Sequence, residues 1–271
     1  MEETSRERVK MMNKGIMISV ITVTYNSAAT VRSTIESVLR QVYQDYEYLV
    51  IDGGSKDNTV DIIKEYEPKF GGRMKWISEK DRGMYDGINK GIRLATGNVV
   101  GIINSDDYYH RTDVFDVIAS AFTAHPGVQA IYGDVRFVNP DNLEKTVRYY
   151  SSKSFKPWKF RWGWMPAHPT FFTYRENFEK YGYYQYDYHI AADFELLTRL
   201  LYTNRLPAVY VPEDFMKMRI GGRSTNGWRA NLLLNKEIVR ACKENGIWTC
   251  MPMLFLKYFV KVFELVRTHN G

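Results

Sequence analysis

From residue 16 onward the sequence alternates between two hydrophobic periods, and this alternation limits the possible folds more than any other feature. A run rich in β-branched residues at 18–24 predicts a strand, and apolar residues at helical spacing follow it. The same order recurs around strands predicted at 46–51, 74–78 and 99–103. Strands that alternate with helices form a mostly parallel sheet with helices on both faces. We therefore predict an α/β protein with a Rossmann-like sheet.

Polar residues follow these strands where each one ends. Tyr25 and Asp52 close the first two strands, Asp81 follows the third, and the pair Asp106-Asp107 follows the fourth. Ligands of such sheets bind beyond the carboxyl ends of the strands, so we expect these side chains at one binding site. The sequence has neither a Gly-x-Gly-x-x-Gly turn after the first strand nor a Gly-x-x-x-x-Gly-Lys segment. The usual dinucleotide-binding and P-loop classes are thereby excluded.

The acidic pair Asp106-Asp107 indicates a cation. Two adjacent carboxylates after a buried strand repel each other and resist desolvation. Oxygen ligands favour Mg²⁺ or Mn²⁺, which usually keep positions open for substrate phosphates. The alternative is a solvated turn with a helix cap, but Asp113 is better placed to cap the next helix. We predict Mn²⁺ or Mg²⁺ at the pair, together with a phosphorylated ligand.

Composition sets broader limits. A formal charge of +6 and a pI near 9.1 are compatible with anionic lipid, nucleic acid or phosphorylated substrates. The only cysteines, Cys242 and Cys250, form no CxxC motif, so we expect neither a disulfide framework nor a zinc site. Residues 1–15 are polar and charged, and they predict a flexible tail rather than a signal peptide or an anchor. These features favour a cytoplasmic protein.

Several ordered blocks of the sequence resemble the family 2 glycosyltransferases, which have the GT-A fold. The blocks are Ile18-Ser19-Val20-Ile21-Thr22-Val23-Thr24-Tyr25-Asn26, Val50-Ile51-Asp52-Gly53-Gly54-Ser55-Lys56-Asp57-Asn58-Thr59 and Asn104-Ser105-Asp106-Asp107. Residues 79–91 are similar to a block in the bacterial polysaccharide-assembly branch of that family. The ordered set is far more specific than any one block.

The resemblance implies an organisation of the chain. We expect a GT-A domain over 16–225, with a donor half at about 16–135 and an acceptor half at about 136–225. A C-terminal helical extension over 226–271 would follow it.

The resemblance also implies a nucleotide-sugar donor, with a UDP-sugar as the expected one, held at the carboxyl edge of the sheet. Thr24, Tyr25 and Asp52 would lie near the base and ribose, and Asp81 would help to line the base pocket.

The remaining donor-side residues would contact the diphosphate, the sugar or the metal. Arg82 and Asn89 would lie near the diphosphate or sugar. Asp106 would approach the ribose or sugar and Asp107 the metal, in a variant of the D-x-D motif written Ser105-Asp106-Asp107. Either carboxylate of the pair is left as the direct metal ligand.

Members of the family invert the anomeric centre in one displacement, so the resemblance calls for a base on the acceptor side. Asp193 resembles the family's acidic segment at the start of a helix and is the candidate base. An ordinary acid in the first turn of a helix is the alternative, because the helix dipole favours one there. Relatives often carry Glu-Asp where this chain has Ala192-Asp193, so Glu195 is kept as a second acceptor-side carboxylate.

Two further segments resemble parts of the family's site. His168 lies in a segment similar to a His-x-x-Phe-Phe pattern and would line the acceptor or sugar pocket, unless it is a hydrogen-bonded core residue. Gly221-Gly222-Arg223-Ser224 resembles a flexible segment that closes over a diphosphate, where Arg223 would neutralise charge. A plain turn with a solvated arginine is the alternative.

Two segments combine aromatic and basic residues, at 155–164 and 251–267. The second shows helical spacing but is too short and too charged to span a bilayer. An interfacial helix on the cytoplasmic face of the membrane is one hypothesis, and a core-packing or dimer-forming helix is the other. If the membrane hypothesis holds, the resemblance implies a sugar on a polyprenyl diphosphate as acceptor.

These inferences predict an inverting, metal-dependent hexosyl- or N-acetylhexosaminyltransferase of cell-surface polysaccharide, O-antigen or capsule synthesis, acting on a glycan or lipid-linked acceptor. A sugar nucleotidyltransferase is a second hypothesis, but Tyr25-Asn26-Ser27 is not its Gly-rich basic loop. A non-catalytic basic surface-binding protein is the third. No nucleic-acid motif is present, so we expect no nucleic-acid partner.

Overall fold

Four parallel strands form one half of a nine-stranded sheet in the computed structural model, which describes residues 15–221 and 228–255. The strands stand in the order β3-β2-β1-β4. Their bounds are β1 (Ile18–Thr24), β2 (Tyr46–Asp52), β3 (Met74–Ser78) and β4 (Val99–Ile102). Each bound lies within one residue of the prediction from hydrophobic periodicity, which is therefore confirmed.

Both faces of this half are buried, and the residues of β1 show why. Ile18 and Val20 point into the core on one face, whereas Ile21 points into the core on the other. β2 alternates in the same way. Strands covered on both faces carry apolar side chains on both, and the apolar residues of β1, β2 and β4 are divided between the two buried clusters in this way.

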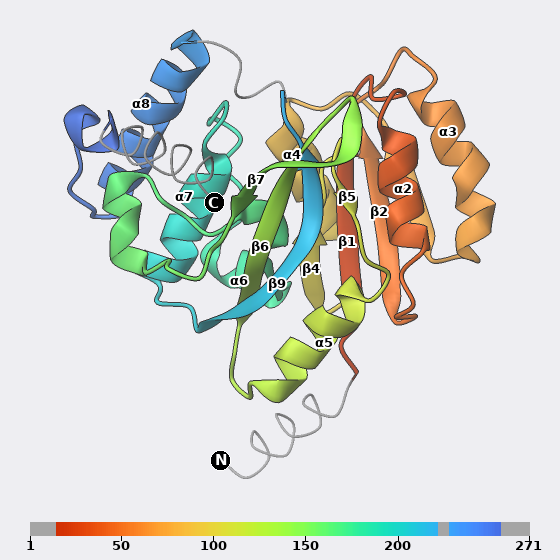
Figure 1. Ribbon diagram of the computed structural model, residues 1–271, viewed down its shortest axis with the longest axis horizontal. Helices are drawn as coiled ribbons and strands as arrows, with labels where there is room; N and C mark the ends of the chain where they lie inside the picture. Colours follow the sequence, from red (N-terminus) through yellow and green to blue (C-terminus); the bar gives the residue numbers. More distant parts are fainter. Residues whose placement is uncertain (1–14, 222–227, 256–271) are drawn as a thin grey trace.

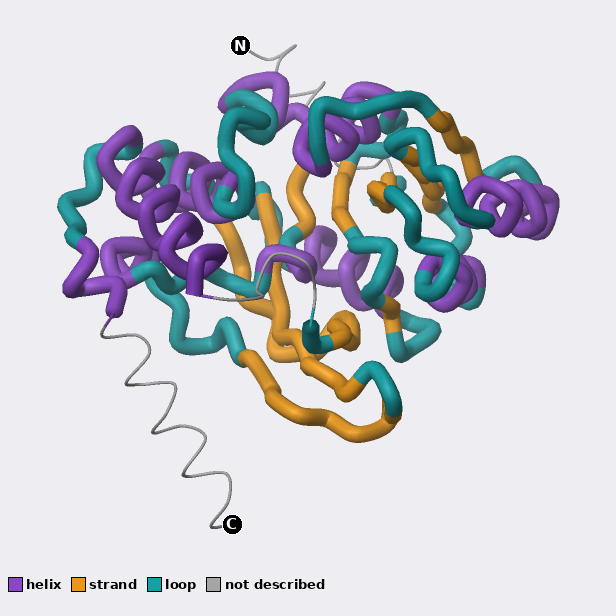
Figure 2. The backbone as a smooth tube through the Cα atoms, turned by 90° about the horizontal axis from the view of Figure 1, so that it is seen from above, coloured by secondary structure: helices purple, strands orange, loops and turns teal. Residues whose placement is uncertain are grey.

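Helices cover the two faces of the sheet (Figures 1 and 2). One face is covered by α2 (Val31–Leu39), α3 (Thr59–Tyr66), the 3₁₀ helix η1 (Glu67–Phe70) and α5 (Val114–Ala124). The other is covered by α4 (Met84–Leu94), α6 (Glu176–Tyr181), α7 (Ala192–Thr198) and α8 (Trp228–Glu244). The prediction of helices on both faces is therefore confirmed.

The helix α4 lies unusually close to β1 because two of its residues are glycines. A Cβ atom on Gly87 would lie 2.8 Å from Val23 Cγ1, and one on Gly91 would lie 2.5 Å from Ile21 Cγ2. Side chains at these positions would push the helix away from the sheet. The glycines thus fix the distance between α4 and the carboxyl edge of β1.

The second half of the sheet is mixed. β8 (Phe172–Tyr174) is antiparallel to both β4 and β6 (Ala130–Asn139), and β9 (Ala208–Arg219) is parallel to β6. β5 (Tyr108–Tyr109) pairs with β9, and β7 (Asn142–Tyr150) forms a hairpin with β6. Short helical turns complete this half: η2 (Pro157–Trp162), η3 (His168–Thr170) and the π-helical η4 (Arg199–Thr203).

The end of the described chain packs into the body of the protein. Ile238 and Cys242 of α8 lie in the same buried cluster as Leu196 of α7, and Ile247 and Leu254 extend it. Within residues 15–221 and 228–255, no helix has the length and apolar character that crossing a bilayer requires.

The predicted cap of α5 has the expected position but lacks the expected hydrogen bond. Asp113 does precede α5, but its carboxylate makes no cap hydrogen bond and instead pairs with Arg111 at 2.7 Å. The nearby guanidinium outcompetes the backbone N–H groups for this carboxylate. The significance of the acidic pair therefore rests on its own contacts.

Candidate active site

Asp52 shapes the turn that follows β2. Its side chain is buried, and its Oδ2 accepts hydrogen bonds from the backbone N–H groups of Gly54 (3.1 Å) and Ser55 (2.9 Å) and from Ser78 Oγ (2.6 Å). Ser55 Oγ donates to Oδ1 at 2.5 Å. Three of these contacts go to Oδ2 and one goes to Oδ1, so Oδ1 keeps an acceptor position. The structure thus gives Asp52 the task of fixing the turn beside the site.

Two buried oxygens beside this turn have no hydrogen-bond partner within the described residues: Thr24 Oγ1 and Asp81 Oδ2. Lys90 Nζ binds the other oxygen of Asp81 at 2.5 Å. A Cβ atom on Gly53 would lie 3.3 Å from Asp81 Oδ2 and 3.6 Å from the ring of Tyr25, which is exposed. Buried acceptors without partners are rare and need an explanation, and a ligand donor group supplies one. The edge around Gly53 is therefore a place where a polar ligand fits.

The acidic pair lies on a tightly held turn. Asp106 is partly exposed and Asp107 is buried. Asn104 Nδ2 donates to Asp107 Oδ2 at 3.0 Å, and Thr34 Oγ1 donates to the Asp107 carbonyl at 2.6 Å. These contacts fix the turn to β4 and α2, so the two carboxylates keep their places.

The hydrogen-bond partners of Asp106 and Asp107 do not by themselves balance the negative charge of the two carboxylates. Burial and the neighbouring Asp106 raise the pKa of Asp107 well above its ordinary value, and Arg219 opposes the shift. A cation would favour the ionised form. The described residues contain no group of three or more His, Cys, Asp or Glu that could hold a metal ion. The two carboxylates of Asp106 and Asp107 fit a divalent cation only if its other oxygen ligands come from a bound molecule or water.

Arg219, at the end of β9, is a site residue that sequence reasoning missed. Its guanidinium donates to the Asp106 carbonyl and, at 2.9 Å, to Ser33 Oγ, and it lies 5.1 Å from the Tyr108 ring centroid. The pairing of β9 with β5 brings it there. Arg223, which the sequence analysis placed at the diphosphate, lies outside the described residues.

Asp193 and His168 lie together on the other side of the site. Asp193 is partly exposed at the start of α7, and desolvation raises its pKa. Desolvation also lowers the pKa of His168, and the charges of the two side chains affect each other. His168 Nε2 lies 2.7 Å from Tyr184 Oη. Burial thus raises the basicity of the Asp193 carboxylate and favours the neutral form of the His168 imidazole.

Glu237 of α8 holds the backbone that leads to Asp193. Its Oε1 accepts a hydrogen bond from the His189 N–H (2.8 Å), and its Oε2 accepts from Ile190 (2.9 Å) and Ala191 (2.8 Å). These N–H groups precede α7, which has no side-chain cap of its own. A carboxylate from another helix thus takes the place of a local cap. No local sequence signal marks Glu237, because the contact joins distant parts of the chain.

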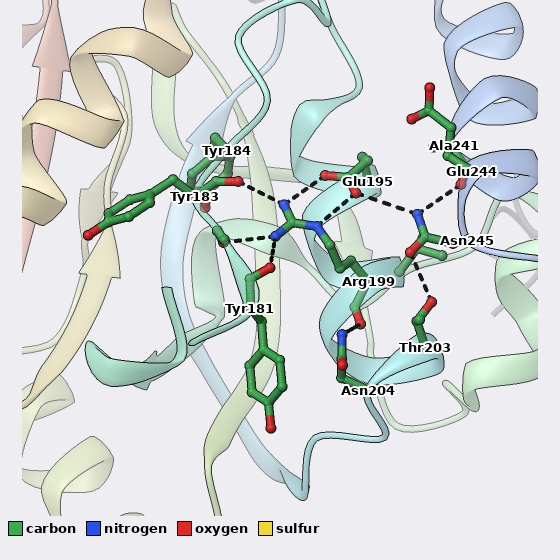
Figure 3. Close-up of polar contacts among 12 residues, drawn as sticks. Tyr181, Tyr183, Tyr184, Glu195, Arg199, Thr203, Asn204, Ala241, Glu244 and Asn245 are labelled. Carbon is green, nitrogen blue, oxygen red and sulfur yellow. Dashed lines mark hydrogen bonds and ion pairs between the residues drawn. The ribbon is translucent and has the colours of Figure 1, made fainter. Parts of the chain in front are cut away.

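The side chain of Glu195 does not share the partly exposed position of Asp193. It is 1% exposed, and both of its oxygens pair with Arg199 at 2.9 Å. Arg199 also binds the backbone carbonyls of Tyr181, Gly182 and Tyr183 (Figure 3). Glu195 therefore fixes the chain before α7, and burial separates it from any acceptor that reaches Asp193.

Asn89 and Arg82, which the resemblance placed near the diphosphate or sugar, also differ in how far they are exposed. Asn89 is buried and exchanges two hydrogen bonds with the backbone of Tyr184, at 2.8 Å and 3.0 Å. Its carboxamide joins α4 to the Asp193 side and is occupied there. Arg82 is exposed, with its guanidinium 5.6 Å from the Tyr186 ring centroid, so it is the one that faces solvent.

The first turns of α4 connect the two sides of the site. Gly87 lies against Asp81, because a Cβ atom there would be 2.9 Å from Asp81 Oδ2. Tyr85 Oη donates to the Ile190 carbonyl at 2.5 Å, directly before α7. One helix thus spans from the unpartnered oxygens to the segment that carries Asp193.

Comparisons with known proteins agree with this arrangement. The sequence model of the family described as Glycosyl transferase family 2 matches residues 19–184. A relative from Mycobacterium bovis, named a PGL/p-HBAD biosynthesis glycosyltransferase, is 27% identical over 224 residues, which are 83% of each chain.

Two solved structures share the fold. A mannosyltransferase from Pyrobaculum calidifontis, in complex with GDP-Man and Mn²⁺, has a TM-score of 0.65 at 19% identity, over 93% of this chain and 73% of that one. Residues 1–349 of S. aureus TarS, in complex with UDP, give 0.60 at 18% identity, over 82% of this chain and 65% of that one. The chain thus spans less than two thirds of the TarS structure.

Proposed function

This chain belongs to glycosyl transferase family 2 and has the GT-A fold, and we propose that it transfers a sugar from a nucleoside-diphosphate donor to an acceptor hydroxyl, with inversion and with a divalent cation. The observation that carries the proposal is the presence of two separate carboxylate sites, one at the carboxyl edge of the sheet and one at the start of α7. Asp106-Asp107 lies beside Arg219, and Asp193 lies beside His168. The family assignment leaves the nucleotidyltransferase and non-catalytic hypotheses without support.

The donor base and ribose would bind around Gly53. A carboxylate oxygen such as Asp81 Oδ2 accepts hydrogen bonds only, and uracil and guanine each carry a ring N–H that could donate to it. Thr24 Oγ1 would pair with a second polar group, and Tyr25 would pack against the base or ribose. Asp52 would hold the turn and lie near the base and ribose. We propose a UDP-sugar; the neighbours bound to UDP and to GDP-Man make a GDP-sugar the competing outcome.

The diphosphate would lie at the acidic pair, with Asp106 and Asp107 holding Mn²⁺ or Mg²⁺. When bound, the cation neutralises the charge that builds on the leaving diphosphate. The Arg219 guanidinium lies beside the pair and would add a second positive charge there. Arg82, exposed at the same edge, would contact the diphosphate or sugar, and Arg223 keeps its proposed role in closing over the diphosphate.

Asp193 would act as the base. The acceptor hydroxyl oxygen forms the new bond to the anomeric carbon, the bond from that carbon to the diphosphate oxygen breaks on the opposite side, and Asp193 takes the hydroxyl proton. His168 would line the acceptor site in its neutral form, oriented by Tyr184. Glu237 would keep Asp193 in place through the backbone before α7.

The acceptor would be a hydroxyl of a glycan or of a lipid-linked glycan in cell-surface polysaccharide synthesis, such as O-antigen or capsule. The hexosyl or N-acetylhexosaminyl identity of the sugar belongs to the same proposal. A cytoplasmic protein that associates with the inner face of the cell membrane fits such an acceptor. Most of the helix predicted at 251–267 lies outside the described residues. The prediction that this helix forms a dimer therefore falls outside them as well.

A nucleotide-sugar panel tests the proposed function. The protein is mixed with UDP- and GDP-sugars, with Mn²⁺ or with a chelator, and thermal stability and release of nucleoside diphosphate are measured. We expect one nucleotide class to raise the melting temperature and to be turned over only with the cation. Stabilisation by no nucleotide sugar under any condition would refute the proposal.

A further inference from the structure

Two exposed tryptophans lie on neighbouring segments far from the donor edge. Trp158 of η2 is 55% exposed, and Trp248, after α8, is 70% exposed. The segments touch: Thr249 Oγ1 donates to the Arg161 carbonyl at 2.5 Å, and Cys242 Sγ lies 3.7 Å from the Phe160 carbonyl. Figure 1 shows both at the same end of the molecule, in green and dark blue. We call residues 153–162 together with 247–255 the basic aromatic face.

The charge of this face has a single sign. The sequence has no Asp or Glu over 146–175 or over 245–255, although the chain holds 31 acidic residues in all. Exposed or partly exposed cations lie on the first segment: Lys153, Lys156, Lys159 and Arg161. None of the ion pairs found among the described residues involves these four. Their charge is therefore available to an anionic partner.

The second segment narrows the class of partner. Residues 246–255 carry no charged side chain, and their exposed members include Trp248, Pro252 and Phe255. A nucleic-acid surface would present cations along its whole length to neutralise phosphates. A bilayer surface instead accepts tryptophan and other apolar groups at the headgroup boundary while its anionic headgroups attract nearby lysines and arginines. The face matches the second description.

The face also adjoins the side of the site that carries Asp193. Phe160 of η2 packs edge-on against Phe194, with ring centroids 5.4 Å apart, and Phe194 follows Asp193. The same chain segment continues from η2 into η3, which begins at His168. One short stretch of chain thus presents Trp158 outward and supports the proposed base inward.

We propose that the basic aromatic face docks the protein on an anionic bilayer surface and so brings the acceptor side of the site to acceptors held in that membrane. The second clause rests on the proposed function. Docking itself requires no turnover, and its test is therefore independent of activity.

Vesicle binding tests the proposal with the full chain. We would measure sedimentation with phosphatidylcholine vesicles and with vesicles that also contain phosphatidylglycerol. We expect binding to the mixed vesicles, weakened by salt, and a blue shift of tryptophan fluorescence. Combining Trp158→Ala with Trp248→Ala should weaken partition about tenfold or more, because both rings leave the interface. Combining Lys156→Glu with Arg161→Glu should do the same by charge reversal, again about tenfold or more.

Matched variants control for exposure and charge. Trp228→Ala removes an equally exposed tryptophan from the start of α8, and Lys64→Glu reverses an exposed charge on α3. Both should bind vesicles as the parent chain does. Melting temperatures of all four variants without any ligand that equal that of the parent chain would show that they are folded.

Three results would overturn the proposal: equal vesicle binding by the double variants and the controls, loss of oligonucleotide binding rather than vesicle binding in the double variants, or conversion of a dimer to a monomer by them. The last result would assign the face to a second copy of the chain. Vesicle binding without any nucleotide-sugar turnover would leave docking intact and refute only the proposed function.

Discussion

The acidic pair and the Asp193 cluster are both carboxylate sites, but the chain builds them differently. Asp106 and Asp107 come shortly after β4, and Asn104, Thr34 of α2 and Arg219 of β9 hold their turn. Asp193 instead stands on a short helix that a distant carboxylate, Glu237, keeps in place. The donor-side carboxylates are thus placed by the end of a strand, whereas the acceptor-side carboxylate is placed by a helix whose start is held by a carboxylate of another helix. The two sides should fail separately when they are mutated.

The largest effect is expected at Asp193. Asp193→Asn keeps the size of the side chain but removes the base, so kcat should fall on the order of 10²- to 10⁴-fold while donor affinity stays the same. Asp61→Asn, on α3, is the matched surface control. Normal turnover by Asp193→Asn, or loss of its donor binding, would contradict the separation of donor and acceptor sides.

The acidic pair should give the next largest effect. Asp107→Ala should lower kcat/KM on the order of 100-fold or more, since it weakens cation-dependent stabilisation of the leaving diphosphate. Comparing it with Asp106→Ala, over a titration of Mn²⁺ and Mg²⁺, identifies the direct ligand. An unchanged cation dependence in both variants would remove the metal from this pair.

The pH dependence of activity tests how Glu237 supports Asp193 on the acceptor side. Desolvation raises the pKa of Asp193, and the nearby Glu237 charge adds a smaller upward contribution. Activity needs ionised Asp193, so it should fall as pH decreases, at a higher pH than for an ordinary carboxylate. Glu237→Gln should move this acid limb to lower pH and reduce kcat about tenfold, with donor KM unchanged.

The control for Glu237→Gln is Glu244→Gln, on the same helix, where the carboxylate binds Tyr188 and Arg240. It should leave the pH profile in place. Equal loss of stability in both variants with no shift of the acid limb would reduce Glu237 to a purely structural residue.

Arg219 should show a smaller effect on the donor side alone. Arg219→Met keeps the length of the side chain but removes the charge beside Asp106, so donor KM should rise about tenfold. Lys217→Met, two residues earlier on β9, loses a pairing with Glu144 instead and should leave KM as it is. A fall in kcat at unchanged KM would place Arg219 elsewhere in the reaction.

Asn89 should give the smallest effect, and on stability. Asn89→Ala loses both hydrogen bonds to the Tyr184 backbone and should lower the free energy of unfolding by about 1–3 kcal/mol, measured by urea denaturation. Donor affinity should change little. A large loss of donor affinity at unchanged stability would restore the direct donor contact that the sequence predicted.

The sequence predicts the first half of the fold and the donor edge because their signals are local. Periodicity places β1 to β4, and the strand ends place Tyr25, Asp52, Asp81 and the acidic pair at one edge. Spacing cannot show that Arg219 reaches the pair, because that contact depends on how β9 aligns with β5.

The acceptor side shows the same limit more clearly. Asp193 and Glu195 stand two residues apart, and the sequence offered both, yet their side chains leave the helix in different directions. The spacing of four residues between Glu195 and Arg199 favours an ion pair on a helix, but only the structure shows that this pair is buried. Glu237 has no local signal, because its partners are backbone N–H groups far away in the sequence.

The most direct test measures donor binding by calorimetry for Asp193→Asn and Asp107→Ala side by side, with Mn²⁺ and with a chelator. We predict that Asp193→Asn binds the donor as the parent chain does, and that Asp107→Ala loses the Mn²⁺-dependent part. Loss of binding in both variants, or in neither, would contradict a site with separate donor and base carboxylates.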